Sequence, residues 1–98
     1  MHRGHLIASM FGGVHNVQNI VPLYELANTP VMRYDLEEPI ARAVRAGEKV
    51  YYRVSAYYKN PGDAVPARLY IMAWGMESSF RCIGIVENVP NPPRATCQ

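Results

Sequence analysis

The sequence lacks a long apolar run and carries little net charge. It contains no stretch of about 18 apolar residues, so it predicts no membrane span. The N-terminus also lacks the charged-then-apolar layout of a signal peptide, because Gly12 and Gly13 interrupt the short apolar stretch LIASMF. The net charge is +2, which ordinary soluble domains reach easily. A nucleic-acid-binding surface would therefore have to arise from clustering of the ten Lys and Arg residues.

Cysteine is scarce. The two cysteines, Cys82 and Cys97, do not have the spacing of a zinc site. A disulfide between them would tie the C-terminal tail back onto a strand, whereas in a reducing compartment they would be free thiols. The sequence leaves these two alternatives open.

The composition is that of one ordered domain. The 98 residues are 49% hydrophobic and 18% charged, with no internal repeat. We expect a single domain over residues 1–98, with a core at 3–47, an antiparallel sheet at 49–87 and an irregular, proline-rich surface tail at 88–98. Residues 4–9 are predicted to form a strand, and residues 14–29 are predicted to be mostly irregular.

A helix is predicted after this irregular segment. Its apolar residues recur every four positions and form one stripe: Met32, Leu36, Ile40 and Val44. Asn28 can cap the helix start, with Pro30 close to the first turn. Gly47 suits the helix end. Pro39 would lose a hydrogen bond inside the helix, so we expect a kink or a restart there.

The remainder of the chain has the pattern of strands. Residues 50–58 alternate, with Val50, Tyr52 and Val54 on one face, and two further strands are predicted at 68–74 and about 79–87. Short connections favour an antiparallel sheet packed against the helix, which is an α+β fold. The tyrosines of residues 51–58 and Trp74 are interpreted chiefly as sheet and core residues, because no motif supports stacking on bases.

Four short fragments stand in order along the first part of the chain: RGH at 3–5, QNIVP at 18–22, LAN at 26–28 and LEE at 36–38. Together with the nearly continuous run RGHLIASMFGG, this order resembles the DNA/RNA non-specific endonuclease family of His-Me finger (ββα-metal) nucleases over roughly residues 3–58. The nearest branch is similar to bacterial toxin domains of the type VII secretion, EssD-like kind. The resemblance implies a strand-loop-helix metal finger packed on an antiparallel sheet.

The resemblance also implies a role for each matching residue. His5 would be the general base, Asn28 the direct ligand of one Mg²⁺ (or Mn²⁺), and Arg3 a phosphate contact. Asn19 would brace the loop or the histidine. This set suits phosphodiester hydrolysis, because a neutral imidazole can accept a proton from water and a hydrated Mg²⁺ needs few protein oxygens.

The carboxylate of the site is open between two neighbours. Glu37 is favoured by its interval from Gly47 and by its place after Leu36. Glu38 could instead form a solvated pair with Arg42. Arg42 is also a candidate for substrate phosphate, although the modest net charge favours its interpretation as an exposed charge.

The leading hypothesis is a metal-dependent DNA/RNA endonuclease. By resemblance it would be a bacterial toxin or effector domain, secreted or delivered into a target cell to act in its cytoplasm and inhibited by an immunity protein. One alternative is a non-catalytic nucleic-acid or protein-binding module on a decayed nuclease fold. His2 replaces the Asp that precedes RGH in the family, and RGH stands close to the chain start where members usually carry further strands upstream; both points favour this alternative. Another is an interaction domain unrelated to nucleases.

Overall fold

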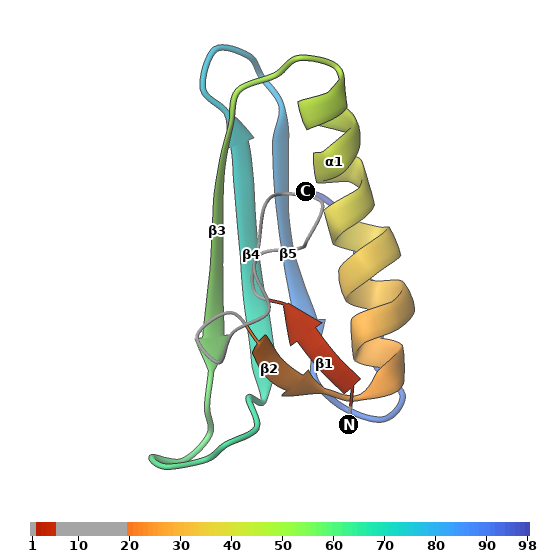
Figure 1. Ribbon diagram of the computed structural model, residues 1–98, viewed down its shortest axis with the longest axis vertical. Helices are drawn as coiled ribbons and strands as arrows, with labels where there is room; N and C mark the ends of the chain where they lie inside the picture. Colours follow the sequence, from red (N-terminus) through yellow and green to blue (C-terminus); the bar gives the residue numbers. More distant parts are fainter. Residues whose placement is uncertain (1, 6–19) are drawn as a thin grey trace.

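The computed structural model describes the backbone of residues 2–5 and 20–98 and the side chains of residues 21–98 (Figure 1). Its elements in chain order are β1 (His2–His5), β2 (Ile20–Leu23), the π-helical segment η2 (Ala27–Glu37), α1 (Glu38–Arg45), β3 (Val50–Tyr57), β4 (Arg68–Gly75) and β5 (Arg81–Glu87). β1 and β2 pair in one antiparallel sheet, and β3, β4 and β5 form a second in that order. The fold is α+β, as predicted.

The three-stranded sheet confirms the predicted strands. Each strand alternates between a face that packs against the helix and a face that points away from it. The residues that β4 and β5 place on the helix side are fully buried: Leu69, Ile71, Ala73, Cys82 and Val86. In β3 the helix side carries the predicted set of Val50, Tyr52 and Val54, which pack against the same core. Figure 1 shows η2 and α1 running along this face.

The helix buries most of the predicted stripe. Met32, Leu36 and Ile40 are each at most 1% exposed. Val44 is 45% exposed, so its assignment to the stripe was wrong, and Ala43 is buried in its place. The reason is geometric, because residues four apart in an α-helix are offset by about 40°, and a strict four-residue repeat drifts off the buried face.

The start of the helix differs from the prediction. Thr29 has extended dihedrals (φ −142°, ψ 117°) and interrupts the helical path, and Pro30 follows it. Asn28 lies in the short turn before this break, with its N–H donating to the carbonyl of Tyr24 at 3.0 Å. The N-cap position belongs to Leu26, and no side-chain cap hydrogen bond forms there. The predicted capping role of Asn28 was therefore wrong.

Pro39 is accommodated by a change of helical spacing. The N–H of Glu38 donates to the carbonyl of Arg33, five residues back, as in a π turn. Pro39 then occupies the first turn of α1, where its missing N–H needs no partner. Glu37 and Glu38 keep right-handed helical dihedrals. The predicted disturbance is a π-to-α transition with no break in the backbone.

Gly47 ends the helix as predicted. Its φ of +95° lies in the region that favours glycine. The N–H of Gly47 donates to Val44 and the N–H of Glu48 donates to Ala43, which is the hydrogen-bond pattern of a Schellman motif. The chain then turns directly into β3.

β2 was not predicted, because residues 14–29 were expected to be mostly irregular. Its four residues pair with β1 in the register His2 with Leu23 and His5 with Ile20. Leu23 is completely buried in the main core. β2 therefore packs on the helix side of the large sheet.

The C-terminal tail is irregular, but it is fastened to the domain at two points. Cys82 of β5 and Cys97 form a disulfide, which settles the choice left open by the sequence. Arg94 donates from Nε to Asp35 of η2 at 2.7 Å, and the N–H of Ala95 donates to the same carboxylate at 3.0 Å. Ala95 and Cys97 pack against the core. The tail is thus more than the surface segment that was predicted.

Candidate active site

The order strand, strand, helix places the motif residues on one substructure. β1 carries Arg3 and His5, with His5 at its last position opposite Ile20. β1 contacts η2, the helical segment that carries Asn28 and Glu37. Figure 1 shows the β1–β2 pair lying beside the start of the helix. The strand with the candidate base therefore lies against the helix with the candidate ligand.

The side chains of Arg3 and His5 and the whole of Asn19 lie outside the described part of the structure. Their predicted roles rest on the motif and on the backbone position of β1. Residues 6–9 of the predicted first strand also lie outside it.

Asn28 lies where the turn after β2 gives way to the helix. Its side chain is half-buried, and the break at Thr29 directly follows it. Asn28 is not the N-cap residue, because Leu26 holds that position, so its carboxamide has no assigned capping role. An amide oxygen is a donor of the type that hard cations such as Mg²⁺ accept.

Glu37 is a buried carboxyl group. It is 7% exposed, lies nine residues after Asn28 in the chain, and is close enough to Tyr52 of the sheet to affect the pKa of that residue. Burial raises the pKa of Glu37 to about 7, an effect that the charge of Arg33 partly opposes. At neutral pH this group is poised between its two protonation states.

Glu38 lies in a different environment. It is half-buried and accepts a hydrogen bond from Arg45 at 2.8 Å. The pair expected from the sequence was with Arg42, four residues on. The two glutamates thus divide into an interior group and a surface ion pair, which favours Glu37 as the site carboxylate.

Arg42 is exposed in the last turn of α1. Fourteen residues separate it from Asn28, which corresponds to about 20 Å along a helix. Arg42 and the β1–β2 pair thus lie toward opposite ends of the helix (Figure 1). A substrate contact at Arg42 would have to be made by a part of the nucleic acid remote from the finger.

Tyr52 is a residue of this site that the motif did not identify. It lies on the helix-facing side of β3, and burial raises its pKa, with the nearby charge of Glu37 as the second cause. The alternation of residues 50–58 had placed Tyr52 on the inner face. Its proximity to Glu37 could not be predicted from the sequence, because it arises from the way the helix packs across the sheet.

The family assignment follows from a comparison of the whole chain with family models. A model described as DNA/RNA non-specific endonuclease matches residues 1–73. The chain belongs to this family. The match spans β1, β2, the helix, β3 and most of β4, so it includes every motif residue of the site. The family assignment supports a nuclease, and a nuclease would bind nucleic acid. Comparisons with curated proteins and with solved structures gave no match.

Two kinds of feature are absent from the described residues. In residues 2–5 and 20–98, no group of three His, Cys, Asp or Glu side chains is arranged to hold a metal ion. Over the same ranges, no helix combines the length and apolar character needed to cross a bilayer.

Substituting Glu37 with glutamine is expected to remove a pH dependence of stability. The ordinary pKa is 4.5 and the folded value is about 7, so the native state binds this proton more tightly than the unfolded chain does. The stabilisation is complete below pH 4.5 and is lost as pH rises through about 7. The gap between the two pKa values corresponds to about 3 kcal/mol. Urea unfolding between about pH 4.5 and about pH 9 measures it.

The matched control is Glu38→Gln, which changes the neighbouring carboxylate in the surface ion pair. We expect Glu38→Gln to keep the pH profile of the wild type, whereas Glu37→Gln flattens it. Equal profiles for Glu37→Gln and the wild type would contradict the buried position of this carboxyl group.

Proposed function

We propose that the domain is a metal-dependent endonuclease that hydrolyses phosphodiester bonds in DNA and RNA. The observation that carries this proposal is the β1–β2–helix order within a chain of the nuclease family, with Asn28 at the helix break and a buried carboxyl group, Glu37, nine residues later. A strand pair followed by a helix is the arrangement that the strand-loop-helix finger requires.

His5 is the proposed general base. At the end of β1 its neutral imidazole accepts a proton from the attacking water near physiological pH. Arg3, two residues earlier on the same strand, contacts the scissile phosphate through its guanidinium group. Asn19 precedes β2 and braces either the loop before it or the His5 side chain. Arg42 holds a more distant phosphate of the substrate.

The residues at the helix suit a hard divalent cation, Mg²⁺ or Mn²⁺. Asn28 offers an amide oxygen as the direct ligand, and Glu37 offers a carboxylate for metal-bound waters. Such an ion would neutralise phosphate charge and stabilise the departing oxygen. Support for the fit comes from Glu37, because a carboxyl group with a pKa near 7 gains its charged form when a cation is added nearby.

The biological setting proposed for this activity is that of a bacterial toxin or effector domain. It would be secreted or delivered into a target cell, would degrade nucleic acid in the cytoplasm and would be inhibited by an immunity protein. The similarity of RGHLIASMFGG to toxin domains supports this setting. Expression in a bacterial host, with and without His5→Ala, tests it by the growth of the cells.

The activity itself is tested on supercoiled plasmid and on single-stranded RNA with Mg²⁺, with Mn²⁺ and with EDTA. We expect nicking and linearisation of the plasmid and loss of full-length RNA with either metal, and neither reaction in EDTA. Intact plasmid and RNA under all conditions would reject the proposal. Nucleic acid bound without turnover would favour the non-catalytic module, which is supported by His2 in place of the family's Asp.

Substituting Asn28 with alanine is expected to raise the Mg²⁺ concentration needed for half-maximal cleavage by at least about tenfold, because the direct protein ligand is removed. A metal titration of plasmid nicking measures this shift. Asn60→Ala, at an exposed loop position, is the control and should leave the titration unchanged. An unaltered metal requirement in Asn28→Ala would remove Asn28 from the site.

A further inference from the structure

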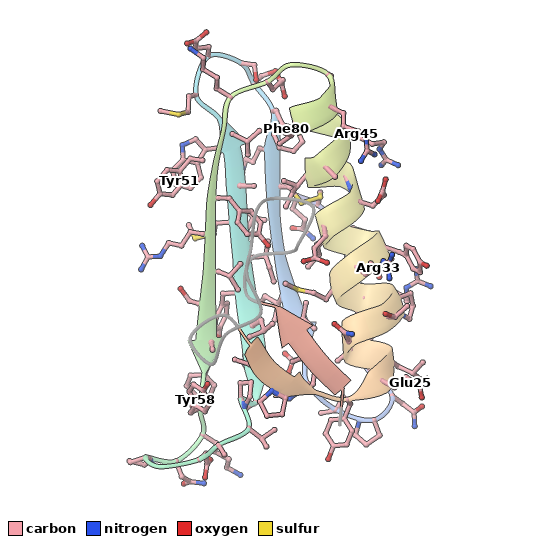
Figure 2. All side chains as sticks on the ribbon, viewed as in Figure 1. Glu25, Arg33, Arg45, Tyr51, Tyr58 and Phe80 are labelled. Carbon is pink, nitrogen blue, oxygen red and sulfur yellow. A yellow bond between two sulfur atoms is a disulfide. The ribbon has the colours of Figure 1, made fainter. Side chains whose placement is uncertain are left out.

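The large sheet has a second face that no element of the described chain covers. η2, α1 and β2 pack on one side of β3, β4 and β5, and the alternate side chains of these strands point to the other side. Figure 2 shows Tyr51 directed away from the helix, whereas Phe80 lies between the sheet and the helix. We call this second side the outer face. The residues on which the inference rests are Tyr51, Arg53, Arg68, Tyr70, Trp74 and Arg81.

The aromatic residues of the outer face form an exposed platform. Tyr51 and Trp74 are register partners on β3 and β4, and their rings stack with centroids 4.5 Å apart and planes inclined by 23°. They are 44% and 40% exposed, and Tyr70 on the same face is 37% exposed. Tyr51 and Trp74 are sheet residues, as predicted, but they are not core residues. Large rings held this far into solvent provide a surface on which a flat ligand can stack.

Arginines surround this platform. Arg81 is the register partner of Trp74 on β5, and Arg53 lies two residues beyond Tyr51 on β3. Both are exposed, and neither forms an ion pair with another described residue. Arg53 and Tyr51 point to the same side of the strand, about 7 Å apart along it. Uncompensated cations thus flank the stacked rings on two sides.

The positive charge of the outer face makes a second copy of the same face a poor binding partner. In the described strands this face carries Arg53, Arg68 and Arg81 against one carboxylate, Glu87, which lies 3.6 Å from Arg68. Two such faces would repel each other. A chain of phosphates with unpaired bases complements both features, because phosphates pair with guanidinium groups and bases stack on aromatic rings.

We propose that the outer face binds single-stranded nucleic acid, with bases stacked on Tyr51 and Trp74 and phosphates held by Arg53 and Arg81. A duplex fits less well, because its bases are already stacked on one another. This inference goes beyond the proposed cleavage, since the outer face lies on the opposite side of the sheet from the β1–β2–helix finger. Binding there requires neither His5 nor a metal ion.

Trp74 is the one tryptophan of the chain, so its emission reports on the outer face directly. We expect a twelve-residue oligothymidylate, added in EDTA so that cleavage is suppressed, to quench this emission. The duplex of the same length should bind at least about tenfold more weakly, because its bases are not free to stack on the platform. Anisotropy of a labelled oligonucleotide gives the affinity where Trp74 is replaced.

Two pairs of variants test the assignment. Tyr51→Ala/Trp74→Ala should weaken binding by at least about tenfold, because the bases can no longer stack on the two rings. The control is Tyr34→Ala, whose ring is 54% exposed on the helix. Arg53→Gln/Arg81→Gln should lower the slope of log affinity against log salt by about 1.4, which is about 0.7 for each phosphate that is no longer neutralised. Its control is Arg45→Gln, an exposed arginine on the helix side.

Several outcomes would overturn the proposal. One is oligothymidylate affinity that is equal in Tyr51→Ala/Trp74→Ala and Tyr34→Ala, with both variants folded by circular dichroism. Another is an oligomer of the wild type that becomes monomeric in Tyr51→Ala/Trp74→Ala without any change in oligonucleotide affinity, which would make the face a self-association surface. Binding that persists in His5→Ala while cleavage is abolished separates this proposal from the proposed function.

Discussion

Replacing His5 with alanine is expected to lower metal-dependent cleavage of plasmid DNA by at least about 100-fold, because the variant lacks the group that accepts the proton of the attacking water. His5 is the last residue of β1, so the substitution lies at a strand end and should leave the core unaffected. The rate of nicking at saturating Mg²⁺ measures the effect, and thermal unfolding shows whether the fold is retained.

The control for this experiment is His15→Ala, because His15 is the one histidine that follows the RGH motif in the chain. It should cleave at the wild-type rate. A small base such as imidazole, added to His5→Ala, should restore part of the activity if the missing group is a base. A folded His5→Ala protein that cleaves at the wild-type rate would rule out His5 as the base.

Replacing Asn88 with alanine is expected to destabilise the domain by about 3 kcal/mol, because it removes three hydrogen bonds of a buried side chain. Asn88 is 5% exposed, and its side chain joins three segments. Its Oδ1 accepts a hydrogen bond from the N–H of Tyr24 at 2.8 Å, and its Nδ2 donates to the carbonyls of Pro22 at 3.2 Å and Pro66 at 2.7 Å. In Asn88→Ala, the N–H of Tyr24 and the carbonyls of Pro22 and Pro66 lose the Asn88 side chain as a hydrogen-bond partner in a largely buried environment.

Urea unfolding at neutral pH measures the destabilisation. The control is Asn91→Ala, in the exposed part of the tail, which should change stability by less than about 0.5 kcal/mol. Asn88→Asp should be as damaging as Asn88→Ala, because a carboxylate cannot donate to the two proline carbonyls. Asn88→Ala within about 1 kcal/mol of the wild type would show that these hydrogen bonds do not anchor β2.

Asn88 also bears on the site. It fastens the end of β2, and β2 is the partner strand of β1, which carries His5. No local pattern singles out this residue, because it stands at the junction between the last strand and the proline-rich tail. Its importance comes from three segments that are distant in the sequence and meet only in the fold.

Periodicity was sufficient to predict the large elements. The alternation of residues 50–58 and the apolar runs that follow predicted three strands whose bounds agree closely with β3, β4 and β5. The stripe through Met32, Leu36 and Ile40 predicted the helix that covers them. Burial of an apolar face is a local pattern repeated over many residues, so it is visible without knowledge of the fold.

Short or irregular features were not visible in this way. β2 has four residues, one of which is Pro22, so its sequence resembles a turn until β1 is placed beside it. Asparagine is a residue type that often caps helices, which is why Asn28 was predicted to cap this one. The helix instead has Leu26 at its N-cap, and the break at Thr29 and Pro30 follows Asn28. The Cys82–Cys97 disulfide could not be predicted either, because the sequence did not show that the tail returns to β5.

The site was predicted from its motif and not from periodicity. The fragments RGH, NIVP and LAN indicated a strand and a helix start that would meet, and the structure places β1 against η2. The choice between Glu37 and Glu38 could not be made from spacing alone, because two adjacent helical residues differ by about 100° around the axis. Packing against the sheet buries Glu37 and leaves Glu38 to pair with Arg45.

The proposed mechanism requires that His5 and Asn28 share one hydrated cation. Paramagnetic broadening by Mn²⁺ in the isotopically labelled domain tests this requirement most directly, with the amide groups of Asn60 and Asn91 as internal controls. At substoichiometric Mn²⁺ we expect the imidazole signals of His5 and the carboxamide signals of Asn28 to broaden together, while both controls stay sharp. Broadening of Asn28 without His5, or equal broadening of all four residues, would contradict a shared cation.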